Sequence, residues 1–396
     1  MKRFPVVLVA LILVTSLVLA GCSSPAPTSS SKPAQTTAAP TTSALPKTTA
    51  APTTSTAPTT QAAAKLPEKI TYSCHAVGTA IHAMVTALGK VASDYSGMLM
   101  VVQPTSGPSA WLPGMTSTGK PELGSQHSLD AWWAYTGKVS AVPIPGEMLG
   151  NKPFYPGYSN LRALAAPARQ GTAMVVRQDS GIKTYADLKK KKYRIASGYM
   201  GQPSAYACLV ANLLNQGMTL DDFIPVIVAN SNEGIKALKE GRVDACDNTI
   251  GSPVVEETNA TVPVRFLSAS DKPEDIQRVV NIFPGSTYAT WSMGPSGVVE
   301  PTVVFTFPTM TMTTTALPNE IAEAVLNAWW DHYQELSKMN VSFERITSPD
   351  KLMITQPSVP YHEGAINFFK KKGIWTAEME NYQQHLLKGE YPFVKQ

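Results

Sequence analysis

The sequence contains few residues of the kinds that build metal centres. Among its 396 residues there are 6 histidines and 4 cysteines. No histidine stands at a metal-ligand spacing from another histidine or from a cysteine. The adjacent pair Cys74-His75 would point to opposite faces of a strand end, which makes a poor catalytic dyad. We therefore expect neither a metal ion nor a cofactor.

Motifs of nucleotide-binding and hydrolytic enzymes are absent as well. The sequence has no Walker phosphate-binding loop and no Gly-x-Ser-x-Gly turn. Catalysis requires a nucleophile and a base in contact, and no pattern proposes such a pair. We expect a protein that is not an enzyme and has no catalytic residues, while a triad spread along the chain stays an open alternative.

Charge is also sparse, since charged residues make up only 16% of the chain. The formal net charge is +4, but five basic residues lie before the first acidic residue, Glu68. Without those five the remaining chain carries a net charge of −1, and a near-neutral body argues against nucleic acid as a partner. The five are Lys2, Arg3, Lys32, Lys47 and Lys65.

The cysteines do not form a disulfide framework. Three of them, Cys74, Cys208 and Cys246, follow the cysteine at position 22. An odd number of thiols cannot pair fully within one chain, so we expect buried free thiols. A bridge between Cys208 and Cys246 stays open as an alternative in an exported protein.

The N-terminus has the pattern of a secretory signal peptide, residues 1–21. Two positive charges precede an apolar run from Phe4 to Ala20, which is short for a spanning helix of about 20 apolar residues. Leu19-Ala20-Gly21-Cys22 resembles the lipobox of bacterial lipoproteins. The resemblance implies that Cys22 is acylated and becomes the first residue of an extracytoplasmic protein held at a membrane. An uncut signal anchor is the alternative.

Residues 22–65 form a linker of unusual composition. After Cys22 it consists almost entirely of Ser, Thr, Pro and Ala. Such a segment has no apolar side chains for a core and is expected to stay disordered, and its prolines keep it semi-extended. It serves either as a tether or as a spacer through surface polymer.

From residue 66 onward, predicted strands and helices alternate. The first run has strands at Lys69–Ser73 and Met98–Gln103, with a helix from about Ile81 to Tyr95 between them. A second such run follows, which predicts two α/β lobes with mostly parallel strands. Lobe I spans 66–162 and is rejoined by about 318–396, and lobe II with the hinge strands spans 163–317. Elements expected in the second run are strands Thr172–Arg177, Tyr193–Ser197, Phe223–Val228 and Arg242–Cys246, helices Tyr185–Lys190, Ala205–Asn215 and Asn232–Glu240, and a crossing strand, Pro301–Leu317.

Four motifs, in order along the chain, resemble one family. They are Leu161–Leu164, Asp179–Lys189, Ala237–Ala245 and Val359–Ala365. Together they are similar to the TAXI family, the extracytoplasmic solute receptors of TRAP-type transporters. The resemblance implies a type II periplasmic-binding-protein-like fold, a carboxylate solute and a TRAP permease as partner, with no ATP. Two loops depart from the family pattern, Cys74–Thr79 and Gly198–Ser204.

Candidate ligand contacts come from loops at the carboxyl ends of strands, where helix N-termini offer N–H groups to a carboxylate. Thr79 and Ser204 are also consistent with ordinary helix caps that bind no ligand. His127 is equally consistent with a histidine on a surface loop. No arginine clamp is evident, although Arg162 and Arg194 are available. The predicted ligand-binding residues are Gly78, Thr79, Ser106, Gly107, Trp111, Gln126, His127, Gly198, Tyr199, Gly201, Gln202, Ser204, Asn248 and Thr249.

Two other functions remain compatible with the same sequence. A receptor of an ABC importer shares the two-lobed fold and the Ser180-Gly181-Ile182 turn. A sensory or partner-binding surface lipoprotein would share the anchor but would not close on a solute.

Overall fold

The structure, a computed structural model, describes residues 65–138, 152–280, 282–283, 285–343 and 346–390. All of these lie in one compact unit, 62–396. The predicted signal peptide, Cys22 and nearly all of the linker fall outside the described residues. None of the described helices is both long and apolar enough to cross a membrane.

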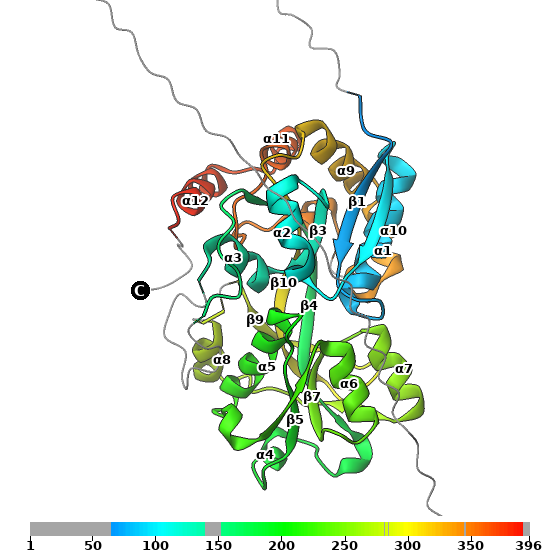
Figure 1. Cartoon of the computed structure of the whole chain (residues 1–396), viewed down its shortest axis with the longest axis vertical. Coiled ribbons are helices and arrows are strands. Elements are labelled where there is room, and N and C mark those ends of the chain that lie inside the picture. Colours follow the sequence, from blue (N-terminus) through cyan, green and yellow to red (C-terminus); the bar gives the residue numbers. More distant parts are fainter. Residues whose placement is uncertain (1–64, 139–151, 281, 284, 344–345, 391–396) are drawn as a thin grey trace, which may run out of the picture. The chain divides into compact units, whose positions relative to one another are not determined.

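One mixed sheet of ten strands runs through the described unit (Figure 1). β8 (Val264–Phe266) pairs with β4, and β9 (Thr287–Trp291) pairs with β10. The other eight strands follow in the order β2 (Leu99–Pro104), β1 (Lys69–Cys74), β3 (Leu123–His127), β10 (Thr302–Thr314), β4 (Leu161–Arg177), β7 (Ala245–Thr249), β5 (Arg194–Gly198) and β6 (Ile224–Val228).

Two long central strands connect the two halves of this sheet. β4 and β10 pair antiparallel from Leu161↔Thr314 to Thr172↔Phe305. One end of β10 also pairs with β3, while the far end of β4 pairs with β7. The buried apolar side chains form two clusters, and the larger one, built mainly on the first lobe, also includes Cys208, Leu214 and Val279 of the second. The predicted fold class, two α/β lobes joined by crossing strands, is confirmed.

The expectation of a mostly parallel sheet holds only outside the crossing. β1 is parallel to β2 and β3, and β5 is parallel to β6 and β7. β4 and β10 are antiparallel to their neighbours. The reason is topological, because one crossing strand leaves the first lobe and the other returns to it.

The first crossing strand is longer than its sequence predicts. A strand was expected only from Thr172, yet β4 begins at Leu161. The additional stretch contains Pro167 and Gly171, residue types that are depleted in strands. The pairing shifts register near Pro167, where Ala166 and Pro167 lie opposite Met310, so a bulge accommodates the proline. The other crossing strand, predicted at Pro301–Leu317, is found as β10.

A second predicted strand was placed too early. Arg242–Asp244 belong to a turn after α6, in which the Arg242 amide donates to the Ala237 carbonyl, and β7 begins only at Ala245. Gly241, at φ +70°, makes this turn.

Helices distant in the sequence gather around the first lobe. Figure 1 shows the C-terminal helices beside those that follow the first strands. The helices of the first lobe are α1 (Ala80–Tyr95), α2 (Pro108–Thr118), α3 (Ser128–Thr136), α9 (Asn319–Asp331), α10 (Tyr333–Met339), α11 (Glu363–Lys371) and α12 (Ala377–Leu387). Those of the second lobe are α4 (Tyr185–Leu188), α5 (Pro203–Asn215), α6 (Ser231–Lys239), α7 (Pro253–Thr261) and α8 (Pro273–Val280). Short 3-10 turns lie at Gln178–Ser180, Leu220–Asp222, Val341–Phe343 and Pro349–Leu352.

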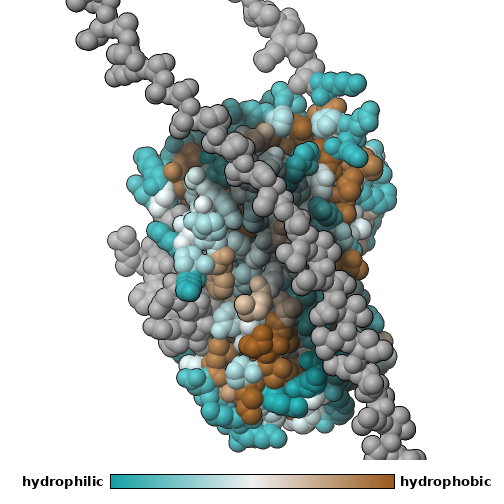
Figure 2. Space-filling view, in the orientation of Figure 1, coloured by the Kyte–Doolittle hydropathy of each residue, from teal (hydrophilic) through white to brown (hydrophobic). Residues whose placement is uncertain are grey.

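Core packing accounts for two tryptophans, and the cysteines are the buried free thiols that were predicted. Trp132 and Trp133 are both buried, since α3 is enclosed along most of its length. Cys74, Cys208 and Cys246 are buried free thiols, and burial raises the pKa of each. On the surface, brown apolar patches lie in the lower half of Figure 2, over the second lobe of Figure 1, and also at the upper right, over the first lobe.

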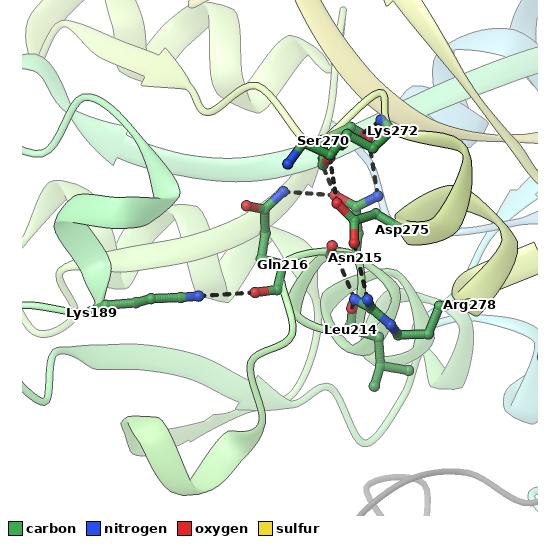
Figure 3. A network of polar contacts seen from close by, with 8 residues as sticks. All are labelled: Lys189, Leu214, Asn215, Gln216, Ser270, Lys272, Asp275 and Arg278. Carbon is green, nitrogen blue, oxygen red and sulfur yellow. Dashed lines mark hydrogen bonds and ion pairs between the residues drawn. The ribbon is translucent and has the colours of Figure 1, made fainter.

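A polar network anchors the C-terminal end of α5 (Figure 3). The buried Asn215 side chain accepts from the Ser270 amide (2.7 Å) and donates to the Ser270 carbonyl (3.1 Å). Arg278 donates to the Leu214 carbonyl (2.8 Å) and pairs with Asp275 (3.0 Å). These contacts satisfy groups at a helix end and tie α5 to α8.

Candidate functional site

Four helices begin around one small cavity between the lobes. Residues at the starts of α1, α5, α6 and α7 contribute to it, together with the ends of β1, β3 and β7 and the middle of β4. Its volume of about 20 Å³ is close to that of a single water. The lobes are therefore closed over it. The lining residues are His75, Thr79, Ala80, Ile81, His127, Gln170, Gln202, Ala205, Ser231, Asn248, Thr249 and Ser252.

The loop between β1 and α1 is clamped by the second lobe. The Val77 carbonyl accepts from the Asn232 side chain at 2.8 Å. The Gly78 carbonyl accepts from the Ser252 hydroxyl and from the Val254 amide, both at 3.2 Å. These bonds join residues more than 150 positions apart in the sequence, so they form only when the lobes meet.

A second contact between the two lobes depends on close backbone packing. Gly107, at φ +144°, lies against the backbone of Gly201. A Cβ placed on Gly107 would lie 2.2 Å from the Gly201 carbonyl oxygen. Only glycine permits both this backbone conformation and this approach, so Gly107 is required for the closed arrangement.

Gln202 connects the two lobes and fixes the protonation of His75. Its Oε1 accepts from the Ser231 amide (3.0 Å) and hydroxyl (2.8 Å), which identifies the other terminal atom as the amide nitrogen. That Nε2 donates to His75 Nδ1 at 3.1 Å. His75 is then neutral and carries its proton on Nε2, an atom that is buried without a partner. The cavity lining therefore includes an unused N–H donor.

Further unpartnered polar atoms come from the same lining. Gln170 is 1% exposed, and neither its amide oxygen nor its amide nitrogen makes a hydrogen bond of normal geometry, although its side chain lies close enough to His127 to oppose the lowering of the pKa of that imidazole. His127 Nδ1 is likewise unpartnered, and its ring packs at 4.3 Å from Phe307 and 5.7 Å from His75. Buried polar groups almost always have partners, so these exceptions leave hydrogen-bonding capacity in the cavity lining unused.

None of the described lining residues is charged at neutral pH. Burial lowers the pKa of His75 to about 3. Burial and the neighbouring His75 hold the pKa of His127 well below its ordinary value. Both imidazoles are thus neutral.

Two buried carboxyl groups lie beside α5, outside the lining. Burial raises the pKa of Asp130 to about 7, opposed by hydrogen bonds to Ser204 and Tyr155. Burial also raises the pKa of Asp247 well above its usual value, opposed by the hydrogen bond from Asn212. Asp130 belongs to α3 and Ser204 to α5, so the Asp130 carboxyl group lies where the two lobes pack together.

Five of the predicted ligand residues line the cavity: Thr79, His127, Gln202, Asn248 and Thr249. Thr79 is also the N-cap of α1, where its side chain accepts from the His82 amide. Asn248 donates to the Ser231 carbonyl.

The other nine predicted residues do not line the closed cavity. Gly78, Gly107 and Gly201 make the crossing contacts described above, with the Ser106 carbonyl next to Gly201. Trp111 packs over Gly124 in the first core. Those that remain are buried or half-buried away from the lining: Gln126, Gly198, Tyr199 and Ser204.

Several lining residues were missed by sequence reasoning, notably His75, Gln170, Ser231 and Ser252. His75 follows the first strand directly, and this position at a strand end was an available signal. Gln170 lies within a crossing strand whose first half was not predicted. Ser231 and Ser252 lie at the starts of helices, where serine is common without any ligand, so residue type alone gives no signal there.

The arginines considered as carboxylate clamps lie elsewhere. Arg194 pairs with Asp244 at 2.7 Å. Arg162 donates to the Ser159 and Leu161 carbonyls and borders a separate cavity of about 290 Å³ beside α11 and α12. A third cavity, of about 470 Å³, includes Arg169 and Trp291 in its lining. Within the described ranges, no group of three His, Cys, Asp or Glu side chains is arranged to hold a metal ion.

Comparison with known proteins places this arrangement in a family. The sequence profile of the NMT1-like family matches residues 120–373, more than half of the chain. The chain belongs to the NMT1-like family. The matched region of this family member includes β3, both crossing strands and the whole second lobe. No curated protein matches the sequence.

Solved structures resemble this NMT1-like chain at low identity. The periplasmic aliphatic sulphonate binding protein SsuA from Escherichia coli is 14% identical, with 81% of this chain and 80% of that chain covered and a TM-score of 0.40. MatC from Rhodopseudomonas palustris, solved with bound malate, is 12% identical, with 81% and 100% covered and a TM-score of 0.46.

Proposed function

We propose that this chain is the solute receptor of a membrane transporter, which captures a small organic acid or amino acid between its lobes. The observation that carries the proposal is the interlobe cavity, where four helix N-termini meet buried polar atoms that have no partner. Sites of this kind, between lobes and with few well-placed polar groups, are typical of small-molecule binding. Thr79, His127, Gln202, Asn248 and Thr249 are the proposed contacts among the predicted residues.

The closed cavity requires a hinge motion. A volume of about 20 Å³ admits no organic acid, so the solute enters while the lobes are apart. The lobes then close by bending at β4 and β10, and the solute selects the closed form by its greater affinity for it. The predicted boundaries, 66–162 with 318–396 for lobe I and 163–317 for lobe II and hinge, are retained as part of this proposal.

The resemblance to TAXI receptors supplies the rest of the pathway. It implies that the closed form docks on the membrane subunits of a TRAP permease and that the protein is held outside the cytoplasm by acyl chains on Cys22. A receptor that feeds an ABC importer would use the same cleft. The neighbouring genes discriminate the two, since a TRAP system has a large multi-spanning permease and an ABC importer has an ATPase with a Walker motif.

A thermal-shift screen with carboxylates, amino acids and neutral controls tests the proposal. A solute present at 100 times its dissociation constant stabilises the fold by about 2.7 kcal/mol, which a melting curve resolves. A selective rise with one class supports the receptor function. A flat response across a broad screen of folded protein contradicts it and favours a partner-binding lipoprotein.

A further inference from the structure

Three of the four helix N-termini at the cavity are already occupied by groups of the protein itself. At α6 the Ser231 amide donates to Gln202 Oε1. At α7 the Val254 amide donates to the Gly78 carbonyl. α5 begins with Pro203, which has no N–H, and the Ser204 amide that follows lies next to the Asp130 carboxyl group. These ends have little capacity left for a ligand.

The N-terminus of α1 is different. Thr79 caps it by accepting from the His82 amide, and the Ala80 and Ile81 amides at its first two positions have no acceptor among the described residues. Both residues line the cavity. Amides at a helix start point outward and the helix dipole adds positive potential, which together favour one anion.

The other unpartnered groups in the lining are uncharged side-chain donors and acceptors, unlike the backbone amides at the start of α1. His75 offers Nε2–H as a donor, and Gln170 offers an acceptor oxygen and a donor nitrogen on one planar amide. His75 is 3% exposed and Gln170 is 1% exposed, so neither can satisfy these groups with bulk water. The set contains donors and acceptors but no charge.

We propose that the solute of this cleft carries one carboxylate together with an uncharged group that both donates and accepts hydrogen bonds, such as a carboxamide. The inference rests on the proposed receptor function and names the class of its solute. The carboxylate meets the start of α1, and the amide meets His75 and Gln170. A second carboxylate would be buried without a cation, and an ammonium group would be buried without an anion, and both arrangements are strongly disfavoured.

This assignment is tested on the full-length protein with sets of ligands that share one carbon skeleton and differ only in the charge of their two end groups. For each of the succinic, glutaric and terephthalic skeletons, the diacid, the monoacid monoamide and the diamide are titrated by calorimetry, with glutamate and glutamine as ammonium-bearing probes. We expect the monoacid monoamide of the best-fitting skeleton to bind at least about ten-fold more tightly than its diacid and its diamide, since each of those leaves a buried group unpaired.

The outcomes separate this inference from the receptor function. Tightest binding by a diacid, a diamide or an amino acid overturns the solute class and leaves the receptor function intact. Absence of binding by every member overturns the class, while the broader thermal-shift screen decides the receptor function.

A charge-altering variant provides an independent readout. Gln170→Arg supplies a cation at the neutral end, so the preference is expected to move from the monoacid toward the diacid. The matched control Gln178→Arg adds the same charge at an exposed position after β4 and is expected to leave the order of affinities unchanged. An unchanged order in a folded Gln170→Arg protein contradicts the assignment, and the wild-type series stands on its own if that variant does not fold.

Discussion

Gly107 of the first lobe touches Gly201 of the second so closely that a Cβ on Gly107 would lie 2.2 Å from the Gly201 carbonyl oxygen. We predict that Gly107→Ala prevents full closure, through this clash and through strain at φ +144°. Solute affinity should fall about ten-fold or more, because the closed state is then rarely populated. Small-angle scattering should show a larger radius of gyration than for the wild type.

The control for this variant is another glycine with positive φ. Gly294, at φ +142°, has nothing within 4 Å of a built Cβ. Gly294→Ala therefore introduces backbone strain at nearly the same φ as Gly107→Ala, without a contact between the lobes. Equal loss of affinity in both variants would show that strain alone, and not closure, accounts for the effect.

Gln202 provides a second test of closure. Gln202→Leu removes the bonds to His75 and Ser231 and leaves the Ser231 amide and His75 Nδ1 without partners. We expect solute affinity to fall by about 10- to 100-fold, as measured by calorimetry.

Gln383→Leu is the matched control for that change. Gln383 is also buried, but its amide bonds the Tyr361 backbone on the far side of the first lobe. Both variants should lose melting temperature, and only Gln202→Leu should lose solute affinity. A parallel loss of affinity would mean that Gln202 acts through overall stability.

Asp130 should make stability depend on pH in a defined direction. Burial raises its pKa from 3.8 to about 7, so the folded protein holds a proton that the unfolded chain releases. The resulting loss of stability begins above pH 3.8 and is complete above about pH 7. Asp130→Asn removes this penalty and keeps an oxygen that accepts from Tyr155. Its advantage over the wild type should grow by about 2–4 kcal/mol between pH 4 and pH 8.

Urea unfolding at a series of pH values measures that difference. Asp221→Asn, at an exposed position, serves as the control for the loss of one carboxyl group. An Asp130→Asn advantage that stays constant with pH would contradict the protonated state of Asp130.

The network at the end of α5 predicts an effect on stability. Asn215→Ala leaves the Ser270 amide and carbonyl without their partners. The expected cost is about 2–4 kcal/mol of unfolding free energy, measured by urea titration. Gln216→Ala removes only one bond to the same Asn215 oxygen and should cost about 1 kcal/mol or less. If both variants lost the same unfolding free energy, the network would contribute little to stability.

Much of the architecture could be predicted from sequence because it is local. The helix from Ala80 to Tyr95 and the strands on either side follow from apolar periodicity and from loops of small residues. The first half of β4 could not be predicted, because its alanines, Pro167 and Gly171 give no strand signal. Only pairing with β10 and a bulge makes that segment a strand.

The candidate site was predictable where it follows strand ends and not where it depends on contacts between the lobes. His127 and Asn248 lie at such ends, Thr79 lies in the loop that follows one, and all three line the cavity. Gln170 lies within the unpredicted strand. His75 becomes an unpaired donor only because Gln202, 127 positions away, occupies its other nitrogen. A relationship of this kind is set by tertiary structure and leaves no sequence signal.

The most direct test of the account is a titration of the best-stabilising solute into the wild type and into Gln170→Leu. The proposed solute lies against the Gln170 amide in the cavity lining, so the variant should stay folded and bind at least about ten-fold more weakly. Unchanged affinity in the folded variant would mean that the solute binds elsewhere, and it would contradict the assignment of the interlobe cleft as the site of capture.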